Sequence, residues 1–402
     1  MRVLQLHNQY QQAGGEDVVV RAERELLGSH GHEVDLLEAD NAEIVGFSGK
    51  VKAALGTIYS PAAKARVAAR IAAFQPDLVH VHNFFPLLSP SVYYACREAR
   101  VPVVQTLHNY RLICPNALLL RSGRPCEECV GKSVPWPGLL HACYRGSRAG
   151  SAAVAAMIGV HRQMGTWMNA VDVFIAATNF SRDKLIEGGL PAEKVAVKPN
   201  FVPDPGSAGD GRGGFALFVG RLSQEKGIAT LLSAWERTNC AIPLKLAGDG
   251  PLAGKVARRA VGGRIQYFGV QPRGEILELM RKAAFLVFPS IGYEGLPMVI
   301  VEAFSSGLPV VAAGHGSMAS LVDHGRTGLH FRPGDAGDLA AKIEWVVANP
   351  AEMVRMRREA RAEYLAKYTP KRNYQMLMEI YDRVTGRKVA TPVTHHAGIA
   401  TR

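Results

Sequence analysis

Short apolar segments typical of buried strands alternate with helical segments along this chain of 402 residues. In the first half, the strand segments are residues 3–7, 33–37, 78–82, 103–107, 173–177 and 195–198. Strands that alternate with helices pair in parallel, because each connection crosses over a face of the sheet. The sequence therefore predicts an α/β fold built on parallel sheets.

A break in this pattern predicts two domains. Residues 199–205 are rich in proline and residues 206–214 in glycine, which is typical of a linker. A composition of 48% hydrophobic and 20% charged residues fits two packed domains on either side of it. The predicted parts are an N-terminal domain at 1–200, a linker at 201–214, a C-terminal domain at 215–369, a terminal helix at 370–385 and a flexible tail at 386–402.

One strand–loop–helix junction carries two carboxylates. A buried strand leads into a loop with Glu294, and Pro297 stands where a helix begins, with Glu302 further along it. The amides of Gly295 and Leu296 then lie at a positive helix end, which suits a phosphate or an electron-rich sugar. Glu302 is placed to accept hydrogen bonds from vicinal hydroxyls such as those of a ribose. The alternative is a capped helix with two solvated glutamates.

Two cations follow another predicted strand, at residues 215–220. Arg221 and Lys226 leave the carboxyl end of this strand, the edge where open α/β sheets bind ligands. A guanidinium fork and an ammonium point charge together suit a diphosphate. Further predicted strands end in turns at residues 248–251 and 269–270.

The second half of the chain resembles the donor-binding half of glycosyltransferase family 4, the retaining nucleotide-sugar transferases of GT-B fold. The resemblance rests on four segments in the same order, VGRLSQEKG, AGDGP, YFG and YEGLP, with Glu302 after the last. It implies two Rossmann-like domains that face each other across a cleft, with the terminal helix crossing back to the first. It also implies a donor site formed by Gly14, Gly15, Gly220, Arg221, Lys226, Gly248, Gly250, Gly269, Val270, Glu294, Gly295, Leu296, Pro297 and Glu302.

Candidate residues of the N-terminal half lie after its strands. Gly14 and Gly15 follow the first strand and let a backbone approach a ligand closely, although a loop without a ligand is the alternative. His108 follows the strand at 103–107, where a structural histidine is the alternative. By resemblance, the glycine loop faces the donor phosphate and the acceptor, and His108 lies at the transferred sugar.

The implied chemistry is transfer of a sugar from a nucleoside diphosphate to an acceptor hydroxyl with retention. By resemblance, the catalytic residues are His108, Glu294, Arg221 and Lys226. Arg221 and Lys226 would neutralise the leaving nucleotide, which is commonly worth several kcal/mol. The sequence has no Asp-x-Asp motif, so we expect no catalytic metal. Glu294 would bind sugar hydroxyls, Glu302 the ribose, and the backbone near Gly269 and Val270 the base; no motif distinguishes the base or the sugar.

Four cysteines form a second cluster in a loop-like insertion at about 111–146: Cys114, Cys126, Cys129 and Cys143. Cys126 and Cys129 form a CxxC pair, and four thiolates suit tetrahedral zinc in a closed structural site. His141 is a possible substitute for one thiolate. Ordinary thiols or a redox-active CxxC pair are the alternatives. A subgroup of the resembled family looks similar in this insertion.

The formal net charge of +12 calls for a partner or another reason. No nucleic-acid-binding motif is present, so we expect no nucleic acid partner. Residues 46–73 carry Lys50, Lys52, Lys64, Arg66 and Arg70 without an acid, which predicts either peripheral contact with an anionic membrane or a solvated helix face. The chain starts in a strand and has no membrane-length apolar run, so it is predicted to be cytoplasmic. Membrane contact would suit a lipid-linked or glycan acceptor in polysaccharide, glycolipid or cell-envelope synthesis.

Two other functions remain open from the sequence. A non-catalytic nucleotide-sugar-binding or scaffold protein would share this fold, although Lys226 and Glu294 are both retained. A nucleotide-dependent dehydrogenase would show a complete Gly-x-Gly-x-x-Gly turn, which the glycine turns here do not form.

Overall fold

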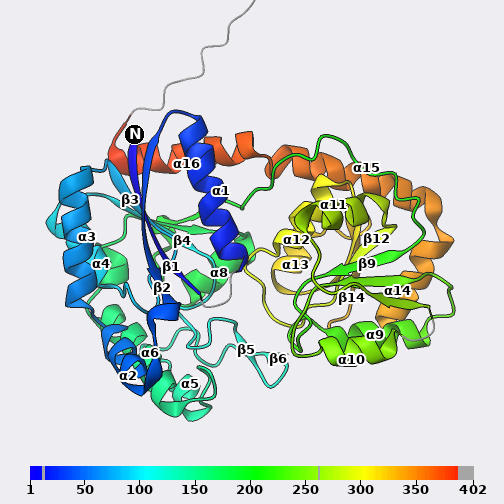
Figure 1. The fold of residues 1–402 in the computed structure, drawn as a ribbon, viewed down its shortest axis with the longest axis horizontal. Helices are drawn as coiled ribbons and strands as arrows, with labels where there is room; N and C mark the ends of the chain where they lie inside the picture. The colour runs from blue at the N-terminus through cyan, green and yellow to red at the C-terminus, as the bar shows by residue number, and fades with distance from the viewer. Residues whose placement is uncertain (11–13, 261–262, 388–402) are drawn as a thin grey trace, which may run out of the picture.

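The computed structural model describes residues 1–10, 14–260 and 263–387, which form two α/β domains lying side by side (Figure 1). The predicted tail lies outside the described residues from position 388 onward. Each domain is built around a six-stranded parallel sheet. The predicted α/β fold with two parallel-sheet domains is therefore confirmed.

The first sheet has the order β2-β1-β3-β4-β7-β8. Its strands are β1 (Arg2–Gln9), β2 (Glu33–Asp40), β3 (Leu78–Val81), β4 (Val103–Leu107), β7 (Val173–Ala176) and β8 (Val195–Val197). Its helices are α1 (Gly15–Ser29), α2 (Gly46–Gly56), α3 (Pro61–Phe74), α4 (Ser91–Glu98), α6 (Arg148–Gln163), α7 (Thr166–Asn169) and α8 (Asn179–Glu187). The strand order reverses between β1 and β3, and a reversal of this kind is where open α/β sheets bind ligands.

The second sheet has the order β11-β10-β9-β12-β13-β14. Its strands are β9 (Ala216–Val219), β10 (Leu244–Ala247), β11 (Ile265–Tyr267), β12 (Phe285–Phe288), β13 (Val310–Ala313) and β14 (Gly328–Phe331). Its helices are α9 (Ile228–Arg237), α10 (Ala253–Arg259), α11 (Arg273–Lys282), α12 (Met298–Ser305), α13 (Gly316–Leu321) and α14 (Ala336–Ala348). Here the order reverses between β9 and β12, which places the loops of Lys226 and Glu294 at the reversal.

The C-terminal helices return the chain to the first domain (Figure 1). Helix α15 (Pro350–Lys367) packs on the second domain, and α16 (Pro370–Thr385) packs on the first. The Thr369 side chain accepts a hydrogen bond from Arg372 N and so caps α16, with proline in the first turn. Leu377, Ile380 and Tyr381 of α16 are buried against Val3 and other strand residues of the first sheet.

The basic segment at 46–73 forms two helices rather than one amphipathic helix. In α3, Lys64 Nζ lies 2.6 Å from Glu98 Oε1, Arg70 pairs with Asp35, and Arg66 donates to the carbonyl of Glu38. The apolar side of α3 is buried in the domain core. The cations of α3 therefore stabilise the first domain itself. Among the helices that the structure describes, none combines the length and apolar character needed to span a bilayer.

The cysteine-containing insertion follows β4 and reaches toward the second domain (Figure 1). It contains a two-stranded hairpin of β5 (Leu120–Arg121) and β6 (Arg124–Pro125) and one short helix, α5 (Trp136–Leu140). At the tip of the hairpin, a Cβ added to Gly123 would lie 3.0 Å from the side-chain amide of Gln224. The insertion thus forms part of the boundary between the domains.

Candidate functional site

The cation and the acid predicted at the second sheet contact each other directly. Lys226 Nζ lies 2.7 Å from Glu294 Oε1, and the Ser290 hydroxyl donates to the same oxygen at 2.6 Å. Gly227 makes this possible: its φ is +71°, and an added Cβ would lie 1.9 Å from the carbonyl oxygen of Pro289. The loops after β9 and β12 therefore touch, and they hold opposite charges at the point where the strand order reverses.

The glycine turns predicted after three strands lie together at one edge of the second sheet. Gly220 N donates to Ala247 O at 3.0 Å, and Gly248 N donates to Gly269 O at 2.7 Å. An added Cβ on Gly248 would lie 2.0 Å from Gly220 O, so only glycine allows this close approach. Arg221 projects from this edge with an exposed side chain and forms no ion pair with any described residue. Its guanidinium is therefore free to meet an anion.

The loop of Glu294 is also bound by the first domain. The carbonyl oxygen of Glu294 accepts a hydrogen bond from Tyr110 OH of the first domain at 3.2 Å, and another from Ser317 Oγ of α13, in its own domain, at 2.6 Å. The carbonyl of Gly295 accepts from Thr178 Oγ1 at 3.3 Å, and an added Cβ on this glycine would lie 2.9 Å from His108 O. The structure thus brings His108 and the loop of Glu294 to one junction between the domains.

The glycine loop of the first domain also faces this junction. An added Cβ on Gly15, the first residue of α1, would lie 3.9 Å from Met298 Cγ at the start of α12. Helix α12 begins directly after Pro297, as the sequence predicts. Gly14 N donates to Asp17 Oδ2 at 2.7 Å, which anchors the start of α1.

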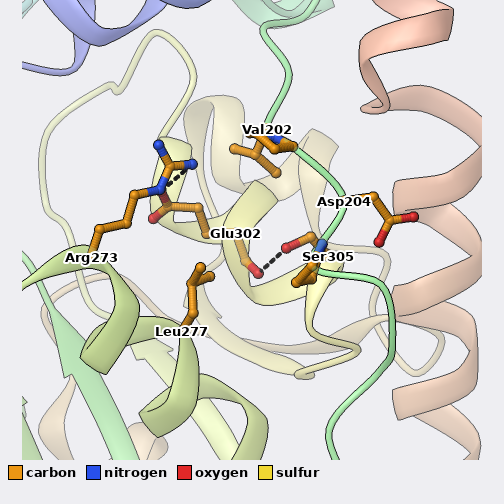
Figure 2. A pocket seen from close by; sticks show the side chains of 8 residues that line it. Val202, Asp204, Arg273, Leu277, Glu302 and Ser305 are labelled. Carbon is orange, nitrogen blue, oxygen red and sulfur yellow. Dashed lines mark hydrogen bonds and ion pairs between the residues drawn. The ribbon is translucent and has the colours of Figure 1, made fainter.

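Glu302 lies apart from the Lys226–Glu294 pair, one turn and more along α12. It lines a cavity of about 170 Å³ together with Val202, Asp204, Arg273, Leu277 and Ser305 (Figure 2). Its Oε1 is 3.8 Å from Arg273 Nη2, and burial raises the pKa of its carboxyl, although Arg273 opposes the shift. A half-buried acceptor beside a cation is suited to hydroxyl groups.

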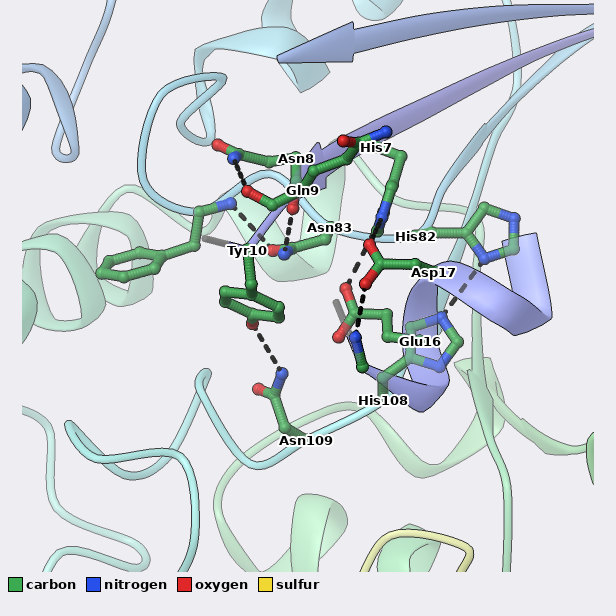
Figure 3. A network of polar contacts seen from close by, with 12 residues as sticks. His7, Asn8, Gln9, Tyr10, Glu16, Asp17, His82, Asn83, His108 and Asn109 are labelled. Carbon is green, nitrogen blue, oxygen red and sulfur yellow. Dashed lines mark hydrogen bonds and ion pairs between the residues drawn. The ribbon is translucent and has the colours of Figure 1, made fainter. Parts of the chain in front are cut away.

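His108 belongs to a polar network that the sequence did not predict (Figure 3). Its Nε2 is 3.3 Å from Nδ1 of His82, which follows β3. His7 Nε2 contacts Asp17 Oδ1 at 2.8 Å, and Asn109 donates to the hydroxyl of Tyr10 at 3.3 Å. Burial, followed by the neighbouring His82 and His7, holds the pKa of His108 well below its usual value, so the ring is neutral at pH 7.

A buried cluster lies behind this network. Glu23, His80 and His82 form the group in the described part of the chain whose possible metal-ligating atoms lie within 4.8 Å of one another. Lys198 Nζ, however, lies 3.1 Å from Glu23 Oε2, and both side chains are only 1% exposed. The ammonium already supplies the positive charge that the carboxylate needs, so the cluster gives no reason to expect a metal ion. Only the position of His82 at a strand end could have indicated it from the sequence.

The four cysteines of the insertion lie in one region, and every cysteine of the chain is a free thiol. Three of them, Cys114, Cys129 and Cys143, lie in segments that pack around Gly138. An added Cβ on Gly138 would lie 2.5 Å from Pro115 Cγ, next to Cys114, and Cys143 N donates to its carbonyl at 2.9 Å. Cys129 Sγ is 3.8 Å from the nearby carbonyl of Pro135. Among the described residues, however, no three cysteine sulfurs lie within 4.8 Å of one another.

Two family models match the chain, one for each domain. The model described as Glycosyltransferase Family 4 matches residues 13–204, and the model described as Glycosyl transferases group 1 matches residues 207–363.

Two curated relatives illustrate the proteins whose sequences are similar to this chain. A glycogen synthase of Mycobacterium tuberculosis is 30% identical over 241 residues, which are 57% of this chain and 58% of that protein. A 2-deoxystreptamine glucosyltransferase of Streptomyces kanamyceticus is 26% identical over 325 residues, covering 78% of this chain and 79% of the relative. The match to the first of these spans little more than half of the relative's length.

Solved structures share the arrangement of the two domains. HepE of Anabaena in complex with UDP matches with a TM-score of 0.68 at 20% identity, over 95% of this chain and 100% of that one. Sucrose-phosphate synthase of Thermosynechococcus elongatus matches with a TM-score of 0.70 at 17% identity, over 96% and 100%. At these identities the likeness concerns the fold.

Proposed function

This chain belongs to glycosyltransferase family 4 and has the GT-B fold, and on that premise we propose that it transfers a sugar from a nucleoside-diphosphate donor to an acceptor hydroxyl with retention. The observation that carries the proposal is the contact of 2.7 Å between Lys226 and Glu294 at the reversal of strand order in the second sheet. The contact supports the proposal, because a cation and a carboxylate this close together can both reach one bound sugar diphosphate.

Each charged residue has a distinct part in the proposed reaction. Lys226 and Arg221 bind the diphosphate and stabilise the negative charge that develops as the bond between the sugar and the phosphate oxygen breaks. Glu294 accepts hydrogen bonds from sugar hydroxyls, and neutral His108 lies on the opposite side of the junction. The leaving phosphate oxygen takes the proton of the acceptor hydroxyl, so no side-chain nucleophile is required. Glu302 binds the ribose.

The contact of 2.7 Å holds the Lys226 ammonium and the Glu294 carboxylate together before the donor binds. When the diphosphate arrives, it competes with Glu294 for Lys226, and the sugar hydroxyls satisfy the carboxylate in turn. The exchange replaces one ion pair by another together with new hydrogen bonds, so neither charge is left buried and unpaired. The Ser290 hydroxyl keeps Glu294 in place during this exchange.

A panel of nucleotide sugars tests the proposed function. We expect one of UDP-, GDP- and ADP-glucose to raise the melting temperature, because a ligand that binds only the folded state stabilises it. UDP is the first ligand to test, since HepE is described in complex with UDP. Slow release of free UDP, GDP or ADP from the stabilising donor then separates an enzyme from a non-catalytic binding protein. Failure of every donor in an extended panel to bind would contradict the proposal.

We propose that a glycan or lipid-linked acceptor binds to the first domain. We propose that the peripheral membrane contact expected of residues 46–73 is made by α2, which exposes Lys50 and Lys52 together with Val51 (42% exposed) and Leu55 (70% exposed). Cosedimentation with vesicles rich in anionic lipid tests this contact, and its loss in a Lys50→Glu/Lys52→Glu variant is the expected result.

We retain structural zinc as the proposed ligand of the cysteine cluster. Its support is the convergence of Cys114, Cys129 and Cys143 around Gly138 in a segment with little regular structure. Zinc–sulfur bonds of about 2.3 Å require the sulfurs to be closer together than they are in this structure, so binding would draw the loop inward. Burial raises the pKa of the Cys129 thiol to about 12, with a further contribution from Cys114. A bound metal would reverse that shift, because it binds the thiolate.

Measuring the zinc content of the purified protein tests the proposal for the cysteine cluster. Protein purified from a zinc-supplemented culture should contain about one equivalent of zinc, and Cys126→Ser/Cys129→Ser should lose it. Cys96→Ser and Cys240→Ser are the matched controls, since both residues lie outside the insertion, and they should retain the metal. Wild-type protein without zinc, or a double variant that keeps it, would contradict the proposal.

A further inference from the structure

Lys198, Glu23, His82 and His108 follow one another in a row of contacts, here called the file, which runs from the interior of the first domain to the domain junction. Lys198 Nζ lies 3.1 Å from Glu23 Oε2, Glu23 Oε1 lies 3.4 Å from His82 Nε2, and His82 Nδ1 lies 3.3 Å from His108 Nε2. The side chains of Lys198, Glu23 and His82 are at most 1% exposed. Bulk solvent therefore does not reach these three side chains, and we expect their hydrogens to be set by their protein neighbours.

Glu23 is the acceptor at the inner end. Burial alone would raise the pKa of this carboxyl, but the Lys198 ammonium and the neighbouring histidines hold it well below its usual value. The group is therefore a carboxylate, which accepts hydrogen bonds and donates none. Its Oε1 lies 3.0 Å from His80 Nδ1 and 3.4 Å from His82 Nε2 without a straight hydrogen bond to either ring. A hydrogen on His82 Nε2 would therefore face an oxygen that can accept it.

Gln5 supports the same hydrogen on His82 Nε2. The amide nitrogen of Gln5 lies 3.5 Å from this nitrogen, and the amide oxygen of Gln5 is buried without a hydrogen-bond partner. Turning the amide by 180° brings its oxygen to His82 Nε2 and satisfies it, which requires Nε2 to carry a hydrogen. The carboxylate and the amide thus favour the same tautomer of His82.

The tautomer of His108 follows from that of His82. Burial, and next the charge of His80, lower the pKa of His82 to about 4, so its ring holds one hydrogen at pH 7. With that hydrogen on Nε2, His82 Nδ1 is an acceptor and His108 Nε2 must donate to it. His108 is also neutral, so its Nδ1 keeps a free lone pair.

We infer that His82 and Glu23 are positioning residues that fix His108 in the Nε2–H tautomer and leave its Nδ1 as a hydrogen-bond acceptor at the junction between the domains. The tautomer is independent of the proposed reaction, whereas its effect on turnover rests on the proposed function. An acceptor nitrogen at this place suits a hydroxyl of the transferred sugar, and the opposite tautomer would turn a donor N–H toward that hydroxyl. The titratable groups that surround His82 and His108 are Glu23 of α1, His80 of β3, Lys198 after β8 and His7 of β1.

Histidine variants and nitrogen NMR test the inference. In protein labelled with ¹⁵N-histidine at pH 7, His108 should show a protonated Nε2 and an unprotonated Nδ1. His82→Leu removes the acceptor and should give a mixture of tautomers, while His82→Asn keeps an oxygen near the position of Nδ1 and should preserve the Nε2–H form. Glu23→Gln removes the carboxylate that favours the Nε2–H form of His82, so both tautomers of His82 should be observed.

Kinetics separate positioning from folding. We expect His82→Leu to lower kcat by about 10- to 100-fold, with the KM for the donor changed less than threefold, because a misplaced hydrogen-bonding group costs turnover rather than ground-state binding. His82→Asn should recover most of this loss. His161→Leu is the matched control: His161 is 1% exposed and bonds to Ile58 and Thr166, away from the file. It should lower the melting temperature without changing the tautomer of His108.

Three results would overturn the inference: an Nδ1–H form of His108 in the wild type, unchanged kcat in folded His82→Leu, or no difference between His82→Asn and His82→Leu. Failure of the proposed function would look different. A protein that binds no nucleotide sugar would yield no kinetics, yet the NMR measurement would still report the tautomer.

Discussion

Lys226→Ala is expected to lower kcat/KM for the donor by about 100- to 1,000-fold. Two unit charges about 4 Å apart near a protein surface interact with about 4 kcal/mol, and each tenfold change in rate corresponds to about 1.4 kcal/mol. Removing the ammonium also leaves Glu294 without the partner that is 2.7 Å away, so the diphosphate meets an unbalanced negative charge. Initial rates at several donor concentrations measure the loss.

Two further variants define what the lysine contributes. Lys226→Arg keeps the positive charge but spreads it over a larger, planar group. We therefore expect a smaller loss, about tenfold. Arg355→Ala is a surface control, because Arg355 pairs with Glu352 in the exposed part of α15 and should leave the rate unchanged. A folded Lys226→Ala enzyme with normal turnover would refute the role of this residue at the diphosphate.

Glu294→Gln is expected to lower kcat by about 100-fold while the protein stays folded. Glutamine keeps the size of the side chain and can still accept from the Ser290 hydroxyl, but it has no charge to balance Lys226 or the positive charge that develops on the sugar. The loss should appear in kcat more than in KM, because that positive charge exists in the transition state and not in the bound donor.

The second acid provides the comparison for Glu294. Glu302→Gln alters a group that lines a separate cavity with Arg273, so we expect a higher KM for the donor and little change in kcat. If the two substitutions gave the same pattern, with kcat lost in both or in neither, the separate roles assigned to Glu294 and Glu302 would be wrong. A double variant of Lys226 and Glu294 should show a loss smaller than the sum of the two single losses, because the residues act as a pair.

Much of the fold could be predicted because strand and helix periods are local properties. The strand predicted at 103–107 is β4 to the residue, and the helix predicted from Pro297 is α12. Charged residues at strand ends were informative for the same reason: parallel strands bring their carboxyl ends to one edge, and Lys226 and Glu294 meet there.

The remainder depends on contacts between distant segments, which no local pattern contains. Glu23 stands in the middle of α1, and nothing around it in the sequence marks it as the partner of Lys198 or a neighbour of His82. For residues 46–73, whose cations have no acid among them, the sequence predicts either contact of a basic helix with an anionic membrane or a solvated helix face. The acids that pair with Lys64 and Arg70, which are Glu98 and Asp35, come from other elements.

The return of α16 to the first domain has a consequence for synthesis on the ribosome. The hydroxyl of Tyr381 lies 2.7 Å from His80 Nδ1, and Asn373 Oδ1 lies 3.3 Å from Lys198 Nζ, so the interior of the first domain is completed by residues from the last described helix. A nascent chain that has released only its N-terminal half therefore holds an unfinished charged interior. This domain has to wait until α16 has emerged before its structure closes.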